Sequence, residues 1–522
     1  MSTGRNLAGR PRRAPLLLFV YIVLLFHISG YVGNEMATAT LSVSMAIVEE
    51  GRLTIGSYTA GARELSWHEG RFYSGMPPGQ SFIATPLYFV LRPAIAAGAR
   101  LITPHLQHLD AAAEYGLDHE FAVRRLLLLI AFTVLLSAPC AAAACVMVVD
   151  IAEALGQRVG PLGALLLPLG TIWWTYGTEY GPRIMGGFLL LLPIWWMFVR
   201  RDRASERQKS AMAVAMGAGL VLAPLIRYEL VLPAVAIGVC LIFQLDRRRI
   251  VGLALAAAVM AGVGIAYHAH CYGGPFNTPY SRKLWPPAAM TPKQRREAAD
   301  RPRVEYENEE WIVWNQEGLI SVTPPVVIRG LWAHPEALLR FSPFLVLVPV
   351  GAALLLWSPR TRGPGLLLVA LSVISIVILL LLPHPGFRGA IGPRYVLWAL
   401  PILVLLALPA WTRLPAAGRA LLFAASFVPS CFAAMLTSHA QSAWSLRQLS
   451  EFGLTNYTLS RAQQAGLLIT PTISTTIVLL FWVVVALVFL RPGSRWYMYG
   501  TPEPDADMNT ASADIENAEA SR

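Results

Sequence analysis

The sequence predicts an all-α polytopic membrane protein, a bundle of about 12 transmembrane helices. Of its 522 residues, 55% are hydrophobic and 14% are charged, and the mean hydropathy is +0.52. Apolar stretches near the ~20 residues that a helix needs to cross ~30 Å of hydrocarbon recur along the chain. The basic residues cluster between these stretches, which is the orientation signal of a membrane protein. The net charge of +11 therefore does not indicate a nucleic-acid partner.

Hydropathy places the spans, and the basic connectors between them set the topology. We expect spans at about 16–33, 124–148, 161–178, 183–199, 211–226, 229–245, 249–268, 341–357, 364–382, 394–411, 418–435 and 471–491. The strongly basic connectors are Arg200–Arg203, Asp246–Arg249, Arg360–Arg362 and Arg413–Arg419. With the N-terminus inside, all four connectors lie on the cytoplasmic side, and so does the C-terminal tail.

One further apolar segment, Ser81–Ile102, decides on which side of the membrane the later connectors lie. It is apolar enough to span, but it carries Pro86, Arg92 and Pro93. If it crossed the membrane, every later basic connector would lie outside. We therefore predict an interfacial or re-entrant helix on the outer face.

The chain is expected to form one transmembrane domain over residues 1–500. Its first extracytoplasmic loop covers 34–123 and a large one covers 269–340, while 501–522 has the composition of a disordered acidic cytoplasmic tail. Basic residues before the first span predict an uncleaved anchor; the alternative is a signal peptide cleaved near Ala37–Ala39. We expect a multi-pass protein of the plasma (inner) membrane with both termini cytoplasmic.

The first outer loop carries the most informative polar residues. Asn34 and Glu35 directly follow the first span, where a carboxylate is costly to desolvate and indicates a functional site. Later in the loop, Tyr73 precedes Pro77 and Pro78, which two glycines flank. These residues predict a rigid turn. The turn is interpreted either as a membrane-anchoring loop or as a wall of a substrate site.

Other outer segments hold further candidates. Glu179 lies in the second outer turn, either as a site carboxylate or as the ion-pair partner of Arg183. Arg227 lies beside Glu229 at an outer hinge, where a charge pair is costly unless it is used or mutually satisfied. Arg394 opens a late span and is expected at headgroup depth, bound to a substrate phosphate or to ordinary lipid headgroups.

The large outer loop begins with a pair of histidines. His268 and His270 are weak candidates for a divalent metal, with interfacial polar anchors as the alternative. Tyr280 follows in the same loop and is a candidate for lining a pocket. Residues 293–310 carry charges in alternating blocks, which predicts a solvated helix face without a catalytic role. No cofactor is predicted with certainty.

The order of these motifs resembles the C-type (GT-C) membrane glycosyltransferase superfamily, in the branch of protein O-mannosyltransferases and lipid A aminoarabinose transferases. The resemblance runs from Asn34-Glu35 through Gly70–Gly79 and the apolar helix after it to Arg124-Arg125 and Glu179, and returns at Gly392–Tyr395. There are two departures. Asn34 stands where the family has Asp, and Met76 stands where it has the Lys before Pro-Pro. Arg71 and Arg63 are the candidates to replace that lysine.

The resemblance implies a GT-C-like bundle with extracytoplasmic juxtamembrane helices and loops. It also implies a polyprenyl-phosphate sugar as donor, a lipid, glycan or protein acceptor, and inversion at the anomeric carbon. Glu35 would be the general base and Glu179 a second site carboxylate. Arg394, Arg71 and Arg227 would bind the donor phosphate, and the pocket would be lined by Asn34, Tyr73, Pro77, Pro78, Tyr280 and Tyr395.

Two other functions fit the hydrophobicity and the number of spans equally well. One is a lipid or glycan transporter or flippase, and the other is a non-catalytic member of the same fold. The transporter does not account for the acidic residue placed directly after the first span or for the rigid Pro-Pro turn, whereas the departures at Asn34 and Met76 leave the non-catalytic member open. We therefore expect a transferase that works at the outer surface.

Overall fold

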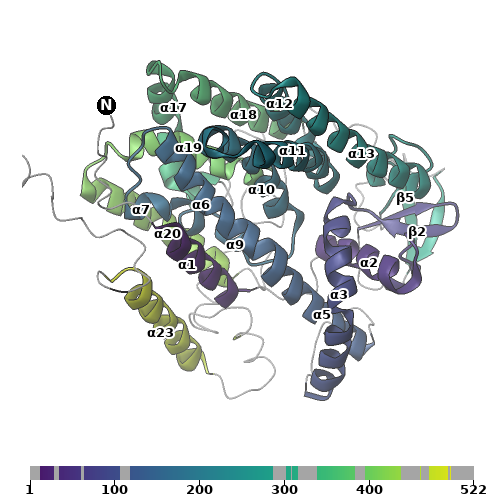
Figure 1. Cartoon of the computed structure of the whole chain (residues 1–522). Coiled ribbons are helices and arrows are strands. Elements are labelled where there is room, and N and C mark those ends of the chain that lie inside the picture. The colour runs from purple at the N-terminus through teal and green to yellow at the C-terminus, as the bar shows by residue number, and fades with distance from the viewer. Residues whose placement is uncertain are drawn as a thin grey trace, which may run out of the picture.

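The computed structural model describes residues 12–28, 35–59, 64–105, 118–285, 301–306, 309–314, 338–381, 394–436, 459, 470–491 and 494. Helices dominate these residues (Figure 1). Seven of the helices are long and apolar enough to cross a membrane: Gly79–Ile102, His119–Ala154, Pro182–Arg203, Glu206–Ile226, Arg247–Tyr272, Ala416–Ala434 and Pro471–Phe489. The chain is a helical, polytopic membrane protein, as the hydropathy predicts.

The predicted spans are helical wherever the structure describes them. In chain order the helices are α1 (Arg13–Phe26), α5 (His119–Phe132) continuing through a π-turn into α6 (Ala138–Ala154), α10 (Pro182–Trp195), α11 (Glu206–Ile226), α12 (Val231–Ile242), α13 (Arg247–Tyr272), α17 (Val348–Trp357), α18 (Arg362–Leu381), α19 (Leu400–Trp411), α20 (Ala416–Leu436) and α23 (Pro471–Phe489). Several of these apolar helices have 10–17 residues and are shorter than a full span. The number of about 12 crossings stays a prediction.

The predicted span 161–178 is not one helix. It consists of three short helices, α7 (Pro161–Ala164), α8 (Leu166–Leu169) and α9 (Trp173–Gly177). Pro168 lacks the amide that would continue the ladder of hydrogen bonds, and Gly170 follows it. Broken helices are tolerated in a bilayer only where protein surrounds them. Accordingly, nearly all side chains of this segment are buried.

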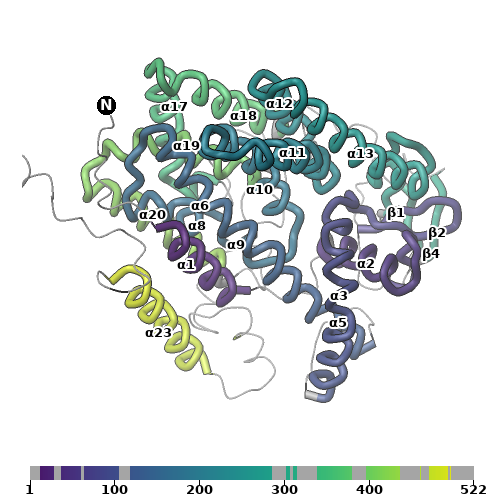
Figure 2. The backbone as a smooth tube through the Cα atoms, in the orientation of Figure 1, coloured from purple at the N-terminus to yellow at the C-terminus, as the bar shows by residue number. Residues whose placement is uncertain are grey.

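The main core lies between α1, α6, α10 and α19, which Figure 1 shows crossing the body of the molecule. Its largest fully buried side chains include Trp173, Trp174 and Trp411. Beside this core, α11 and α13 pack along each other (Figure 2). A Cβ on Gly217 would come within 2.1 Å of the Leu253 carbonyl oxygen, so only glycine permits this approach of two backbones.

The two long loops that are predicted to lie outside contribute to a five-stranded antiparallel sheet that the sequence did not predict. The strands are β1 (Leu65–His68), β2 (Arg71–Ser74), β3 (Lys283–Trp285), β4 (Arg303–Tyr306) and β5 (Glu309–Trp314), in the order β2-β1-β3-β5-β4. The turn between β1 and β2 is Glu69-Gly70, with φ of 48° and 74°. Two consecutive residues with positive φ are typical of a tight hairpin turn whose twist matches its strands.

The sheet corrects the prediction of a solvated helix face at 293–310. Residues 303–306 and 309–310 belong to strands, and 293–300 lie outside the described residues. The alternation of the sequence explains the strand, because Val304 is buried while its neighbours Arg303 and Glu305 are exposed. Across the ladder, Arg303 pairs with Glu310, with 2.9 Å between Nη1 and Oε2. This ion pair is diagonal across the two strands, because the register places Glu305, not Arg303, directly opposite Glu310.

Two helices connect the sheet to the bundle. Helix α2 (Glu35–Glu50) packs against α3, α5 and β2, and α3 (Gly79–Ile102) packs against α2, α5 and α11. Helix α3 runs without a break through Pro86 and Pro93. By length and composition it is long enough to cross a membrane. Its predicted position on the outer face therefore stays a prediction.

Candidate active site

The sheet joins the first outer loop to the large outer loop. Strand β1 pairs with β2 on one side and with β3 on the other, where Ser66 lies opposite Lys283. Lys283 also forms an ion pair with Glu64, with 2.5 Å between Nζ and Oε2, and the Ser66 hydroxyl donates to the Pro279 carbonyl at 2.8 Å. Two segments more than 200 residues apart in the chain thereby form one rigid wall.

The Pro-Pro turn is packed on both sides against backbone. A Cβ on Gly75 would lie 2.7 Å from the Glu64 carbonyl carbon, and one on Gly79 would lie 2.6 Å from the Leu225 carbonyl carbon. Pro77 and Pro78, between these two contacts, are buried. The turn is therefore fixed between the sheet and the end of α11, and its contact on α11 lies two residues before Arg227.

At this end of α11, a charge pair is buried. Arg227 is 5% exposed and Glu229 is 11% exposed, and the Arg227 Nε donates to Glu229 Oε1 at 2.5 Å. The Arg227 Nη2 lies against the same oxygen. Of the two expectations for this hinge, the mutually satisfied pair is the arrangement that the structure contains. A guanidinium has five N–H donors in a fixed planar geometry that matches carboxylate and phosphate groups.

An aromatic cluster lies between this hinge and the sheet. The Tyr228 hydroxyl is 2.9 Å from His268 Nε2, and the Tyr228 ring lies edge-on to Tyr280 with centroids 5.8 Å apart. Tyr272 donates from its hydroxyl to the Ser74 carbonyl at 2.9 Å, and its ring centroid is 6.3 Å from that of Tyr73. The structure thus brings two predicted pocket residues, Tyr73 and Tyr280, to the outer end of α13. Burial raises the pKa of Tyr73, so its hydroxyl stays protonated at neutral pH.

The second acidic turn approaches the same region. Glu179 forms an ion pair with Arg183, with 3.3 Å between Oε1 and Nη1, and Arg183 stacks over the Tyr176 ring at 4.7 Å. The next residue, Tyr180, is 2% exposed and belongs to the same buried cluster as Ile226. Glu179 thus has the partner that its structural interpretation predicts. Whether it acts on a substrate stays a prediction.

Several predicted residues lie at or beyond the edge of the described structure. Glu35 is the first residue of α2, and Arg394 and Tyr395 begin a 3-10 turn that leads into α19; the side chains of these three residues are not described. Asn34 lies outside the described residues. Arg71 begins β2 and is exposed, on the same face of the strand as Tyr73.

A buried clamp, which sequence reasoning missed, holds the far end of α2. The Glu49 carboxylate accepts hydrogen bonds from Arg124 Nη2, from the Tyr88 hydroxyl and from the Tyr58 hydroxyl, the last at 3.0 Å. These partners come from α5, from α3 and from the turn before the sheet. Burial and the neighbouring Glu49 charge raise the pKa of Tyr58. Four elements thus meet at one carboxylate, whose sequence context, Glu49-Glu50-Gly51, is that of an exposed helix end.

Between Glu35 and this clamp, α2 is buried on all sides from Ala37 to Ala46 and carries several hydroxyl side chains. Thr38, Thr40, Ser42 and Ser44 are each at most 1% exposed. Ser81 donates from its hydroxyl to the Thr40 carbonyl at 2.8 Å, and Ser44 donates to the Ser81 carbonyl at 3.2 Å. Hydroxyls that bridge two backbones fix the relative position of α2 and the start of α3, and with it the position of the Glu35 backbone.

Gln80, beside the Pro-Pro turn, is a further residue that the sequence did not single out. Its side chain is fully buried, and neither Oε1 nor Nε2 has a hydrogen-bond partner among the described residues. An unsatisfied buried amide costs about 1–3 kcal/mol, so its presence calls for a role. Gln80 lies one residue after the contact between Gly79 and α11, where the candidate site residues converge.

The histidines at the end of α13 do not form a metal centre within the described parts of the chain. His268 is occupied by Tyr228, and His270 is exposed. No group of three or more His, Cys, Asp or Glu side chains that could hold a metal ion occurs among the residues that the structure describes. The alternative interpretation, that these histidines are polar anchors at an interface, stays a prediction.

Comparisons with known proteins place one solved structure beside this chain. It is the crystal structure of ArnT from Cupriavidus metallidurans in the apo state, with 15% sequence identity and a TM-score of 0.42. The match covers 78% of this chain and 60% of that chain. ArnT, a lipid A aminoarabinose transferase, belongs to the branch that the sequence motifs resemble. No protein-family model matches this chain. No curated protein matches it either. Because a TM-score below 0.5 does not establish a common fold, function is proposed from this chain's own residues.

Proposed function

We propose that this protein is an integral membrane glycosyltransferase that moves a sugar from a polyprenyl-phosphate donor to an acceptor on the extracytoplasmic face, with inversion. The observation that carries the proposal is the packing of the Pro-Pro turn against Leu225, beside the buried Arg227–Glu229 pair. The Pro-Pro turn and the Arg227 hinge, two separate candidates about 150 positions apart in the chain, are neighbours in space.

The proposed chemistry requires one base and a clamp for the leaving group. Glu35 takes the proton of the acceptor hydroxyl as the acceptor oxygen bonds to the anomeric carbon. The bond from that carbon to the donor phosphate breaks, and its electron pair leaves with the polyprenyl phosphate. A phosphate is a good leaving group at neutral pH, so no general acid is needed.

Cationic side chains then stabilise the charge that develops on the leaving phosphate. Arg227 is proposed for this role because its guanidinium is preorganised by Glu229 at the end of α11. Arg394 and Arg71 are proposed as further phosphate contacts. Tyr73 and Tyr280 are proposed to line the pocket. Glu179 is proposed as the second acidic residue, held in place by Arg183.

The test compares the turnover of purified wild type, Glu35→Gln and Glu50→Gln in nanodiscs on a panel of polyprenyl-phosphate sugars, read by release of polyprenyl phosphate. Glu50 is the matched control, because it is an exposed carboxylate at the opposite end of the same helix. We expect wild type and Glu50→Gln to consume one donor. We expect Glu35→Gln to lose about 10²–10⁴-fold in turnover while it still binds that donor.

The alternative functions predict other results. Equal turnover by Glu35→Gln and wild type would keep the enzyme and would reject Glu35 as the base, with Glu179→Gln as the next variant. No release from any donor, with any acceptor offered, would contradict the transferase and favour a transporter, flippase or non-catalytic protein.

A further inference from the structure

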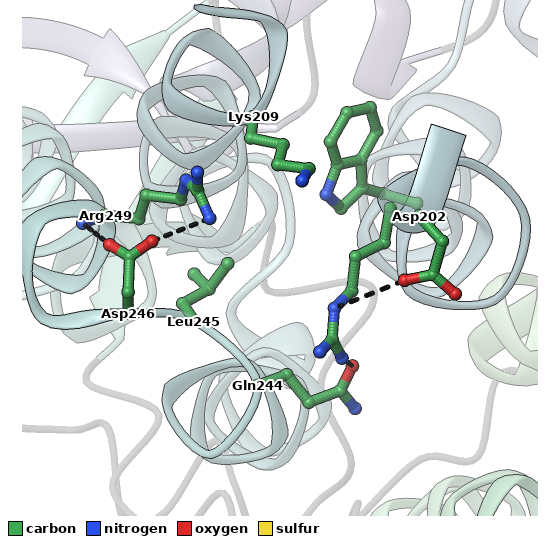
Figure 3. Close-up of a pocket in the computed structure, with 8 residues that line it drawn as sticks. Asp202, Lys209, Gln244, Leu245, Asp246 and Arg249 are labelled. Atoms are coloured by element: carbon green, nitrogen blue, oxygen red, sulfur yellow. Dashed lines mark hydrogen bonds and ion pairs between the residues drawn. The ribbon is translucent and has the colours of Figure 1, made fainter. Parts of the chain in front are cut away.

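A pocket of about 250 Å³ lies at the end of the bundle opposite the candidate active site. It is formed where α10, α11 and α13 begin or end at the two basic connectors, Arg200–Arg203 and Asp246–Arg249. Figure 3 shows Lys209 on one wall, Arg249 and Asp246 on a second, and Asp202 across from them. Helix α13 has 26 residues, so the pocket lies about 39 Å from the aromatic cluster at its other end.

Positive charge exceeds negative charge around this pocket. The segments 200–209 and 246–249 contribute eight Arg and Lys side chains but only three Asp and Glu side chains. Those acids are already engaged: Glu206 pairs with both Lys209 and Arg249, and Asp246 pairs with Arg249 at 2.7 Å between Oδ2 and Nη1. The described acids therefore do not neutralise the connectors, and the excess favours an anion.

Two groups in the pocket have hydrogen-bonding capacity that the protein satisfies weakly or not at all. Arg201 donates from Nη1 to the neutral Gln244 amide oxygen at 3.0 Å, and its nearest carboxylate, the exposed Asp202, is 4.0 Å from Nε. The Nε of Arg249 is buried and has no hydrogen-bond partner among the described residues. A cation held by a neutral amide and an unsatisfied buried donor are both stabilised by an incoming anion.

The N-termini of two helices add to the positive electrostatic potential in this pocket. Helices α11 and α13 both begin at this pocket, at Glu206 and Arg247, and they pack along each other. The positive ends of their dipoles therefore lie side by side. Ser205 caps one helix and Asp246 caps the other, and each side chain satisfies one of the several unpaired amides of its first turn.

We propose that this pocket binds the phosphate of an anionic membrane lipid. A volume of 250 Å³ is about eight times the share of one water in the liquid, which is room for a phosphate and part of a glycerol headgroup. Trp196 and Leu245 add apolar surface to the lining, which suits an amphipathic ligand. Basic pockets between transmembrane helices at the membrane surface are suited to such headgroups. The proposal does not depend on the transferase activity.

The experiment measures lipid retention by native mass spectrometry of the full chain after exchange into detergent with phosphatidylglycerol or phosphatidylcholine. The variants are Arg201→Gln with Lys209→Gln, and Arg201→Gln alone. The matched control is Arg413→Gln, an exposed arginine on another basic connector, outside the pocket. A second arm adds inorganic phosphate and records the midpoint of thermal unfolding.

We expect wild type and Arg413→Gln to retain phosphatidylglycerol over phosphatidylcholine. Each removed charge should weaken retention about fivefold, and the double variant should lose about thirtyfold. The single variant keeps the test interpretable if the double variant does not fold, because the Arg201 side chain is 44% exposed and tolerates replacement.

Three results would overturn the proposal. The first is equal retention of the two lipids by wild type. The second is an equal loss in Arg413→Gln and in Arg201→Gln, which would indicate attraction by the whole basic face. The third is displacement of the lipid and full thermal protection by inorganic phosphate, which would assign the pocket to a soluble phosphate.

Discussion

Replacing Glu49 by glutamine tests how the first outer loop is held together. The side chain keeps its shape, but it loses the charge that faces Arg124 and offers N–H donors where Tyr58 and Tyr88 donate. Removing one partner of a buried ion pair costs about 3–5 kcal/mol. Because the Glu49 and Arg124 side chains keep 14% and 21% of their exposure, we expect the lower end, about 3 kcal/mol.

The assay is equilibrium unfolding in mixed detergent micelles, carried through a double-mutant cycle. Arg124→Met alone should cost a similar amount, because it leaves the Glu49 carboxylate buried without its cation. The double variant should be more stable than the sum of the single losses by about 1–3 kcal/mol. The control is Glu50→Gln, the exposed neighbour, for which we expect less than about 0.5 kcal/mol. Equal effects at Glu49 and Glu50 would refute the clamp.

Two further predictions concern Gln80 and Tyr58. Gln80→Leu removes the buried amide that has no described partner, so it should raise the free energy of unfolding by about 1–3 kcal/mol. The same substitution should lower the turnover of the proposed enzyme. A loss of stability in denaturant would contradict this prediction. The raised pKa of Tyr58 means that the folded state keeps its proton above pH 10.0, its ordinary value, where the unfolded chain releases it. Its contribution to stability is therefore complete below that pH and is lost as pH rises toward the raised pKa. The unfolding midpoint should fall more steeply from about pH 10 to 11 in wild type than in Tyr58→Phe, and parallel curves would reject the shift.

The helical spans could be predicted because the bilayer imposes a strong local rule. A stretch such as Ile250–Ala266, within the helix Arg247–Tyr272, is apolar throughout, and no tertiary contact is needed to recognise it. The same rule wrongly predicted one continuous helix at 161–178. Pro168 and Gly170 interrupt the helix, but they do not lower the mean hydropathy enough to be noticed.

The sheet could not be predicted in the same way. Its strands have three to six residues, and the pairing of β1 with β3 joins Ser66 to Lys283 across most of the first half of the chain. Local patterns carry little information about such a contact. The hairpin could be recognised in the sequence, because Glu69-Gly70 separates two short segments in which apolar and polar residues alternate. The segment was instead interpreted as a possible membrane-anchoring loop, because it lies beside the Pro-Pro turn.

The candidate site was predictable in its parts. Sequence reasoning proposed the Pro-Pro turn, Arg227, Tyr73 and Tyr280, and their roles in a site stay predictions. It did not predict that the turn packs on Leu225 or that Tyr228 meets His268. Glu49 and Gln80 gave no signal, since their importance comes from burial, and burial at these positions depends on how α2, α3 and α5 assemble.

The contact at Gly217 has a mechanical consequence. Two helices whose backbones are in contact cannot slide or rotate independently, so we expect α11 and α13 to tilt as one rigid body. Arg227 and Tyr228 follow the end of α11, and His268 and Tyr272 lie near the end of α13, so these four side chains keep their spacing during any such tilt. Gly79 makes the same kind of backbone contact with Leu225, so the Pro-Pro turn moves together with the end of α11. We therefore expect a thicker or thinner membrane to tilt the Pro-Pro turn, the Arg227–Glu229 pair and the aromatic cluster together, without a change in the spacing between them.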